Sequence, residues 1–262
     1  MDATVEFNKA RWEELSAANV QYTRPMLNLD KNAAVSLVDP EGQLRTIVGL
    51  KVLCLAASGG QQSAAFSLLG AEVTVFDISE RQLRKDRDTA EHYGCRVTTV
   101  QGDLQDLSGL GRAAFDIVWL AHSINFVPDA RRVIGQIARV CKAGARIRVN
   151  FTNPFVHGVA SHKMADGFLL TQAYEDGAEV SYADPYWHFT DPNGDPKVVL
   201  GPREFRHRLS TIINTVIENG LTIDGFWEEI GTEPNPTVGS WAHFCKVAPP
   251  WLTIWATSRF GG

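Results

Sequence analysis

The fold is decided by the stretch Lys51-Val-Leu-Cys-Leu-Ala56, which continues as Ala57-Ser-Gly-Gly60. A short apolar run that ends in small turn residues is typical of a buried strand, and a helix is expected after it, from about residue 61 to 69. Gly70 then stands where a helix commonly ends. This order of strand, turn and helix predicts the first unit of a parallel α/β sheet.

The same alternation of strand and helix continues toward the C-terminus. Strands are predicted at 72–77, 96–101, 115–120, 145–151, 221–230 and 251–258, and helices at 79–93, 129–141 and 202–219. Ser79 and Gln82 have the spacing of a capping box, in which each side chain satisfies the other residue's backbone amide. The helix predicted at 202–219 has an apolar stripe that runs from Phe205 to Ile217.

Two segments lie outside this alternation. Residues 1–49 are predicted to form an amphipathic helix at 5–20 and then an irregular cap. Residues 152–200 combine several Gly and Pro residues with seven aromatic side chains. Structureless insertions of this length in a compact domain are usually lids or binding loops, so this segment is expected to cover a ligand. The whole chain, 1–262, is predicted to be one domain.

Composition excludes several classes of protein. The chain has 262 residues, of which 44% are hydrophobic and 21% charged, so an ordinary globular core is expected. Its formal charge is −5 with no basic block, which argues against a nucleic-acid partner. Four widely spaced cysteines indicate reduced thiols in a cytoplasmic protein. No signal peptide or membrane span is predicted, and a monomer or a homodimer is expected.

Acidic residues stand where ligands bind to a doubly wound sheet, outside the carboxyl ends of its strands. The turn at 56–60 lets the backbone approach a ligand, although tight packing also selects small residues. Asp77 follows Gly60 by seventeen residues and ends the next strand, where a carboxylate can accept both hydroxyl hydrogens of a ribose. Asp103, after the third strand, can accept from an adenine amine while the Leu104 amide donates to the ring; a helix cap is its alternative role. Together these features predict an adenosine-containing ligand.

These motifs resemble those of the class I S-adenosylmethionine-dependent methyltransferases, from about residue 50 to 151. The stretches similar to successive family motifs are 52–60, 73–79, 100–104, 115–120 and 138–144. The segment from Phe7 to Trp12 also resembles a group of small bacterial members. The resemblance implies an α/β fold: a Rossmann-like, doubly wound sheet of about seven strands, mostly parallel with an antiparallel last strand, and helices on both faces.

The resemblance also implies S-adenosylmethionine as the cofactor and S-adenosylhomocysteine as its product. It places ten residues around that cofactor: Ala56, Ala57 and Ser58 at the methionine end, Asp77 at the ribose, Asp103 and Leu104 at the adenine, Ala121 beside the sulfonium, and Gly60, Ile78 and Gln82 nearby. Two of them, Ala56 and Ser58, stand where the family usually has glycines, and Cys54 replaces an acidic residue. An added Cβ disfavours a backbone φ above zero.

The reaction implied is transfer of a methyl group to an O, N, S or C atom of a small-molecule acceptor. Alignment can supply most of the catalysis of such an in-line displacement, and a base is needed only if the acceptor must lose a proton. His122, directly after the fourth strand, is the first candidate for that base or for an acceptor contact, because its ordinary pKa suits neutral pH. A histidine that merely packs is the alternative. His157, His162 and His188 are further candidates.

Aromatic residues are candidates for the acceptor pocket. Tyr22 is expected either to close over the cofactor or to lie exposed on a mobile arm. Tyr186, Trp187 and Phe189 are adjacent enough to form an aromatic wall, although core packing would account for them equally well. No carboxylate cluster follows the fourth strand, so no metal is expected.

Three other functions share some of these features. An α/β hydrolase could use Ser58 as its nucleophile, because the turn at 56–60 approximates a nucleophile elbow. An NAD(P)-dependent oxidoreductase would share the turn and the ribose acid, but the chain has no G-x-G-x-x-G and no Tyr-x-x-x-Lys. The altered first motif also allows a binding protein without catalysis.

Overall fold

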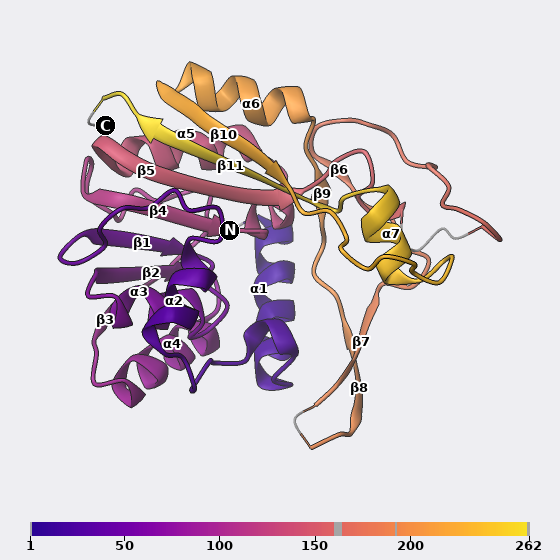
Figure 1. Cartoon of the computed structure of the whole chain (residues 1–262), viewed down its shortest axis with the longest axis horizontal. Coiled ribbons are helices and arrows are strands. Elements are labelled where there is room, and N and C mark those ends of the chain that lie inside the picture. The colour runs from indigo at the N-terminus through magenta and orange to yellow at the C-terminus, as the bar shows by residue number, and fades with distance from the viewer. Residues whose placement is uncertain (1, 160–163, 192, 261–262) are drawn as a thin grey trace.

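A seven-stranded sheet forms the centre of the computed structural model, which describes residues 2–159, 164–191 and 193–260. Its strand order is β10-β11-β5-β4-β1-β2-β3 (Figure 1). The strands are β1 (Lys51–Leu55), β2 (Glu72–Asp77), β3 (Val97–Gln101), β4 (Phe115–Ala121), β5 (Cys141–Thr152), β10 (Leu221–Glu228) and β11 (Trp251–Ser258). The last strand, β11, runs antiparallel to both of its neighbours, whereas β1 to β5 pair in parallel. The predicted sheet is confirmed.

Helices cover both faces of this sheet. Those that pack on its faces are α2 (Lys31–Val38), α3 (Gln62–Leu68), α4 (Glu80–His92), α5 (Ala130–Val140) and α6 (Leu209–Glu218). The helix α1 (Ala3–Ala17) crosses one edge of the sheet, and α7 (Trp241–Val247) lies away from it (Figure 1). One apolar cluster joins the sheet to α5 and α6, and the other joins it to α2, α3 and α4. Because both of its faces are covered, β1 is completely buried from Val52 to Leu55, and its sequence is therefore a continuous apolar run.

The four cysteines are free thiols, as predicted. Burial raises the pKa of Cys54 and of Cys141, so both thiols stay protonated. Within the described ranges, no helix is long and apolar enough to cross a membrane.

Two local predictions were wrong, and one helix was missed. Phe205 belongs not to a helix but to the short strand β9 (Phe205–Arg206), because its extended backbone pairs with β6 (Ala178–Glu179). The helix α6 therefore begins only at Leu209, and Ile217 on it is 56% exposed. The predicted irregular cap contains α2, whose N-cap Asp30 accepts a hydrogen bond from Ala33 N at 2.8 Å. The seven-residue α7 was not predicted at all.

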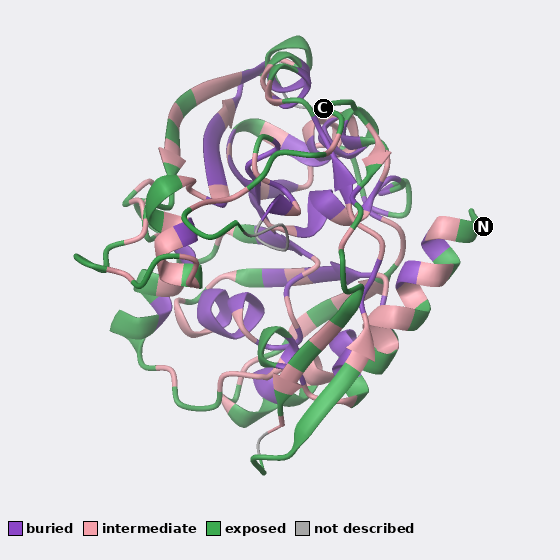
Figure 2. Cartoon of the chain, turned by 90° about the vertical axis from the view of Figure 1, so that its right-hand side faces the viewer, coloured by how far each residue is buried: buried purple, intermediate pink, exposed green. Residues whose placement is uncertain are grey.

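The segment 152–200 is more regular than the sequence indicated. Besides β6 it contains a hairpin made of β7 (Tyr186–Thr190) and β8 (Pro196–Leu200), which extends away from the sheet (Figure 1). The hairpin end from Asp195 to Val198 is exposed (Figure 2). At this same end of the hairpin, Arg24, which follows α1 in the chain, donates to Thr190 O at 2.6 Å.

Candidate functional site

The carboxyl ends of β1 to β4 meet at one edge of the sheet, and α1 crosses this edge (Figure 1). In the N-terminal half of α1, the Asn8 side chain donates to Phe126 O at 2.8 Å, in the 3-10 turn η2 (Ser123–Phe126) that follows β4. At the other end, Ser16 Oγ donates to Gln82 Oε1 of α4 at 3.1 Å. The helix therefore spans the region in which a doubly wound sheet binds its ligand.

The loop after β1 has an unusual backbone. Ala56 and Ser58 have φ angles of 50° and 57°, in the left-handed region that side chains disfavour. Ala56 N donates to Phe76 O of β2 at 2.8 Å, and Ala57 is buried. The positions where the sequence lacks the usual glycines therefore do adopt positive φ. Strained backbone of this kind clusters at functional sites.

The two glycines of this loop pack against α4. Gly60 donates its amide to Asp86 Oδ1 at 2.7 Å and accepts from Met26 N at 3.0 Å, so both of its backbone groups are bound within the protein. Its φ is +94°, and a Cβ there would overlap the Thr89 side chain. At Gly59 a Cβ would lie 2.6 Å from Gln82 Oε1. Gly60 was predicted to contact the cofactor, but its surroundings account for it as a packing residue.

Asp77 is buried at the end of β2, with only 6% of its surface exposed. Burial, and secondarily the nearby charge of Glu13, raises the pKa of Asp77 to about 7, while the hydrogen bond that Ser79 N donates to its Oδ1 at 2.8 Å opposes this shift. The adjacent Ile78 is half-buried. A carboxylate buried next to a positive-φ loop at the end of a parallel strand is the strongest functional signal in this region.

The Gln82 side chain binds α1 and does not complete a capping box. Ser79 Oγ accepts from Gln82 N at 3.2 Å, as predicted, but the Gln82 side chain accepts from Ser16 instead of returning to Ser79. The predicted capping box is therefore only half formed, because Asp77 already accepts from the Ser79 amide.

Lys85, one turn further along α4, also fixes the segment that follows α1. Its Nζ donates to Ser16 O at 2.9 Å, to Asn19 Oδ1 at 3.0 Å and to Thr23 O at 2.8 Å. Burial lowers the pKa of Lys85 to about 8. The residues around Gln82 and Lys85 thus hold the N-terminal segment over the strand ends.

Asp103 caps no helix, because residues 104–107 form a turn and not the helix that its alternative role required. Its Oδ1 accepts from Gln105 N at 3.0 Å, and its Oδ2 accepts from Gln105 Nε2 at 3.2 Å. The backbone amide of Leu104 makes no hydrogen bond to another described residue. The Leu104 amide therefore has its donor free for a ligand, and the Asp103 carboxylate, which can accept about four hydrogen bonds, keeps acceptor capacity beside Gln105.

His122 follows β4 in a left-handed conformation, with φ at 51°. Its ring lies 4.1 Å from that of Trp251 between centroids, and its Nδ1 is buried without a hydrogen-bond partner among the described residues. Burial, and secondarily the charge of Arg148, lowers the pKa of His122 to about 4. The expectation of a pKa suited to proton transfer at neutral pH is therefore wrong. The preceding residue, Ala121, is half-buried.

The predicted aromatic wall is divided by strand alternation. Trp187 faces α1, where its ring makes edge-on contacts with Trp12 at 5.9 Å and with Tyr22 at 6.2 Å between centroids. Tyr186 and His188 lie on the opposite side of β7 and are exposed, because successive residues of a strand face opposite ways. His188 contacts Asp184 Oδ2 at 2.8 Å. Phe189 is on the Trp187 side.

The other predicted residues lie apart or outside the described ranges. His157 is buried, and its Nε2 lies 2.7 Å from Glu204 Oε2. His162 falls outside the described residues. Ser58 Oγ has no hydrogen bond to a base within the described part of the chain, so the arrangement of a hydrolase nucleophile is not found there. Nor do those residues contain a group of three or more His, Cys, Asp or Glu that could hold a metal ion.

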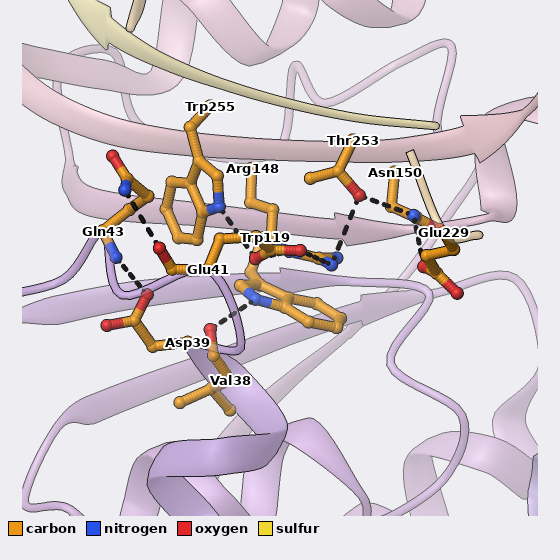
Figure 3. A network of polar contacts seen from close by, with 10 residues as sticks. All are labelled: Val38, Asp39, Glu41, Gln43, Trp119, Arg148, Asn150, Glu229, Thr253 and Trp255. Carbon is orange, nitrogen blue, oxygen red and sulfur yellow. Dashed lines mark hydrogen bonds and ion pairs between the residues drawn. The ribbon is translucent and has the colours of Figure 1, made fainter. Parts of the chain in front are cut away.

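Sequence reasoning missed a buried polar network that joins Glu41, after α2, to side chains of β5 and β11 (Figure 3). Arg148 of β5 donates to both carboxylate oxygens of Glu41, at 2.8 and 3.1 Å. Trp255 Nε1 donates to the same carboxylate at 3.0 Å, and the guanidinium lies 4.8 Å from the Trp119 ring centroid. The one sequence signal for this network is Arg148 itself, because an arginine in the middle of a predicted buried strand indicates an acidic partner on the face that it occupies.

Comparisons with known proteins agree with this geometry. Residues 53–149 match a family model described as a methyltransferase domain. The chain is 34% identical over 199 residues to a protein of Bacillus subtilis strain 168 named uncharacterized methyltransferase YbaJ, and the alignment covers 73% of each chain. The chain belongs to the class I S-adenosylmethionine-dependent methyltransferases. Over a shorter stretch of 101 residues, the methyltransferase is 30% identical to a ubiquinone biosynthesis O-methyltransferase of Idiomarina loihiensis, covering 38% of this chain and 42% of that one.

Solved structures share the fold of this methyltransferase. An S-adenosylmethionine-dependent methyltransferase from Clostridium acetobutylicum aligns with a TM-score of 0.60 at 14% identity, covering 90% of this chain and 94% of that one. One from Mesorhizobium loti aligns with a TM-score of 0.58 at 16% identity, covering 87% and 100%. These two structures show the fold alone, and the cofactor, S-adenosylmethionine, follows from membership of the family.

Proposed function

We propose that this methyltransferase moves the methyl group of S-adenosylmethionine to a nucleophilic O, N, S or C atom of a small-molecule acceptor. The observation that carries the proposal is the buried Asp77 carboxylate beside the positive-φ loop at 56–58. In this proposal residues 1–262 act as one domain, with 1–49 as the cover and 152–200 on the acceptor side. The enzyme works in the cytoplasm as a monomer or homodimer, in keeping with its free thiols.

The residues present fit the cofactor. In the proposed arrangement, Ala56, Ala57 and Ser58 hold the methionine end, Asp77 accepts from the ribose hydroxyls, and Leu104 donates to the adenine. Ile78 and Ala121 form apolar walls, while Gly60, Gln82 and Asp103 support the loops. Two buried atoms near this edge, Gln62 Oε1 and His122 Nδ1, have no partner among the described residues. Orphaned buried polar groups are rare, and a bound polar ligand would satisfy them.

Catalysis is proposed to come mainly from alignment. When bound, S-adenosylmethionine supplies a methyl group on a good leaving group, and S-adenosylhomocysteine is the product. The chain's part is to hold the acceptor in line and to exclude water, for which α1 and the Trp12–Trp187 contact lie in place. Well-oriented systems gain up to roughly 7–11 kcal/mol from such positioning.

His122 serves in this mechanism as a neutral hydrogen-bonding group and not as a general base. With its pKa lowered to about 4, the ring is uncharged at pH 7 and a weak proton acceptor. We expect His122→Ala to retain kcat within about fivefold, with an unchanged rate profile between pH 6 and 8. General bases contribute about 10²–10⁴-fold, so a loss of that size in steady-state assays would contradict this role.

The proposal is tested by screening small thiols, phenols and amines for uptake of labelled methyl from S-adenosylmethionine. We expect labelled acceptor and an equal amount of S-adenosylhomocysteine to form. The fold alone does not decide this outcome, since a structure named the [4+2]-cyclase SpnF aligns with a TM-score of 0.55 at 16% identity. A chain that binds the cofactor but forms S-adenosylhomocysteine with no acceptor in any class would contradict the proposal.

A further inference from the structure

A cavity of about 410 Å³ lies between α1, the segment 179–187 and the segment 200–204. Its volume is within the range of small-molecule pockets, roughly 300–1,000 Å³. The apolar and aromatic side chains that line it include Phe7, Val180, Trp187 and Leu200. Trp187 also contacts Trp12, which lies 5.0 Å from Phe126 between ring centroids. Its wall is therefore continuous with the turn that follows β4, next to the proposed methyl-transfer site.

One buried carboxylate, that of Glu204, lines this cavity. Its side chain is 14% exposed, and its Oε2 accepts from Tyr182 Oη at 2.8 Å and contacts His157 Nε2 at 2.7 Å. Burial, and secondarily the Glu204 charge, raises the pKa of the Tyr182 hydroxyl, which therefore stays protonated and donates. An ionised carboxylate can accept about four hydrogen bonds, and both contacts from described residues are on Oε2, so among these residues Oε1 is left available to a ligand.

The other charged groups at the cavity are already paired. Arg203 lies 4.8 Å from the Phe7 ring centroid and 3.6 Å from Glu179 Oε1, and Asp184 contacts His188 at 2.8 Å. Glu204 has no cationic side chain beyond His157 as a partner within the described residues. A buried anion among aromatic side chains is suited to a ligand cation, which gains from both the charge and the ring faces.

We infer that this cavity binds the ammonium group of a small amine, with Glu204 as its anionic contact and His157 and Tyr182 as the residues that position Glu204. The amine is then the anchoring group of the methyl acceptor, an assignment that rests on the proposed function. The binding itself does not depend on it. This inference predicts selectivity for a cation over a neutral molecule of the same shape.

The test is calorimetric titration of the full chain at pH 7 with 2-phenylethylamine and with its neutral counterpart 2-phenylethanol. We expect the wild type to bind the amine at least tenfold more tightly than the alcohol. Glu204→Gln, which keeps the shape and removes the charge, should lower the amine affinity at least tenfold and abolish the preference. Asp184→Asn is the control at an exposed acid of the same cavity, and should stay within twofold.

Equal binding of amine and alcohol by the wild type, or wild-type amine affinity in Glu204→Gln, would overturn the inference. If that variant does not fold, titration of the wild type decides instead: a preference of at least tenfold for the amine over the alcohol supports the inference, and no preference overturns it.

Titration with S-adenosylmethionine separates this inference from the proposed function. Glu204→Gln should bind the cofactor with wild-type affinity. A wild type that selects the amine but does not bind the cofactor would leave the cavity assignment standing and remove the methyltransferase proposal. A wild type that binds the cofactor but does not select the amine would remove the cavity assignment and leave the methyltransferase proposal standing.

Discussion

Asp77→Ala should weaken the binding of S-adenosylmethionine about 100-fold or more. The buried carboxylate is proposed to accept two charge-assisted hydrogen bonds from the ribose, and each bond to a charged group contributes about 1.5–3 kcal/mol. Their loss, about 3 kcal/mol or more, corresponds to at least two decades in the dissociation constant. Isothermal titration of the variant and the wild type at pH 8 measures the difference.

Glu72→Ala is the matched control, because it removes a carboxylate from the exposed other end of the same strand. We expect its cofactor affinity to stay within twofold of the wild type. An Asp77→Ala variant that binds as tightly as Glu72→Ala would remove the ribose assignment. Thermal unfolding of both variants checks that the sheet is intact.

The same carboxylate should make cofactor affinity depend on pH. Its pKa is raised to about 7, so the ionised form that accepts both hydroxyl hydrogens is lost as the pH falls through 7. Affinity should decrease about tenfold from pH 8 to pH 6, since a pH unit below the pKa costs about a factor of ten. The sign for stability is opposite: because folding favours the protonated acid, this group lowers stability as pH rises from its unfolded pKa, about 4, to 7. Affinity that is flat over this range would contradict the assignment.

Glu41→Ala should lower the free energy of unfolding by about 3–5 kcal/mol, because it leaves the Arg148 guanidinium buried and unpaired. The two side chains are 10% and 6% exposed, and Trp255 also loses its acceptor. Burial alone would raise the pKa of Glu41, but the hydrogen bonds from Arg148 and Trp255 hold it below its ordinary value. This stabilisation is therefore present above about pH 4.5 and lost as the pH falls through the lowered pKa. Urea unfolding measures both effects.

Glu218→Ala is the control for this ion pair. Glu218 and Arg131 lie 3.7 Å apart, with side chains 63% and 55% exposed, and their separation should cost within about 0.5 kcal/mol. The double variant Glu41→Leu and Arg148→Met should recover most of the lost stability, because it removes the unpaired charge as well as its partner. A Glu41→Ala variant no less stable than Glu218→Ala would show that the buried pair contributes nothing.

The sheet and the cofactor-binding edge could be predicted from the sequence because their signals are local. A parallel strand covered on both faces must be apolar throughout, as Val52 to Leu55 are, and the residue that ends such a strand is placed at the ligand edge by topology. Asp77 follows from this rule alone. The side-chain bonds of a helix cap are harder to predict from the sequence. Gln82 could bond either to Ser79 or to a residue of a helix distant in sequence, and in the structure it bonds to Ser16 of α1.

The rest of the site depends on contacts between residues far apart in the chain. Glu41 and Arg148 are 107 residues apart in the chain, and Glu204 and His157 are 47 residues apart, so no local sequence pattern predicts either pair. The division of Tyr186 from Trp187 required knowing that 186–190 is a strand and not a loop. The low pKa of His122 required its burial against Trp251, which joins the site from the last strand.

The most direct test of the central claim is titration of the wild-type chain with S-adenosylmethionine, S-adenosylhomocysteine and NADH. We predict saturable binding of the first two with one molecule per chain, and no heat from NADH. Absence of binding by S-adenosylmethionine and S-adenosylhomocysteine at millimolar concentration, or tighter binding of NADH, would contradict the account.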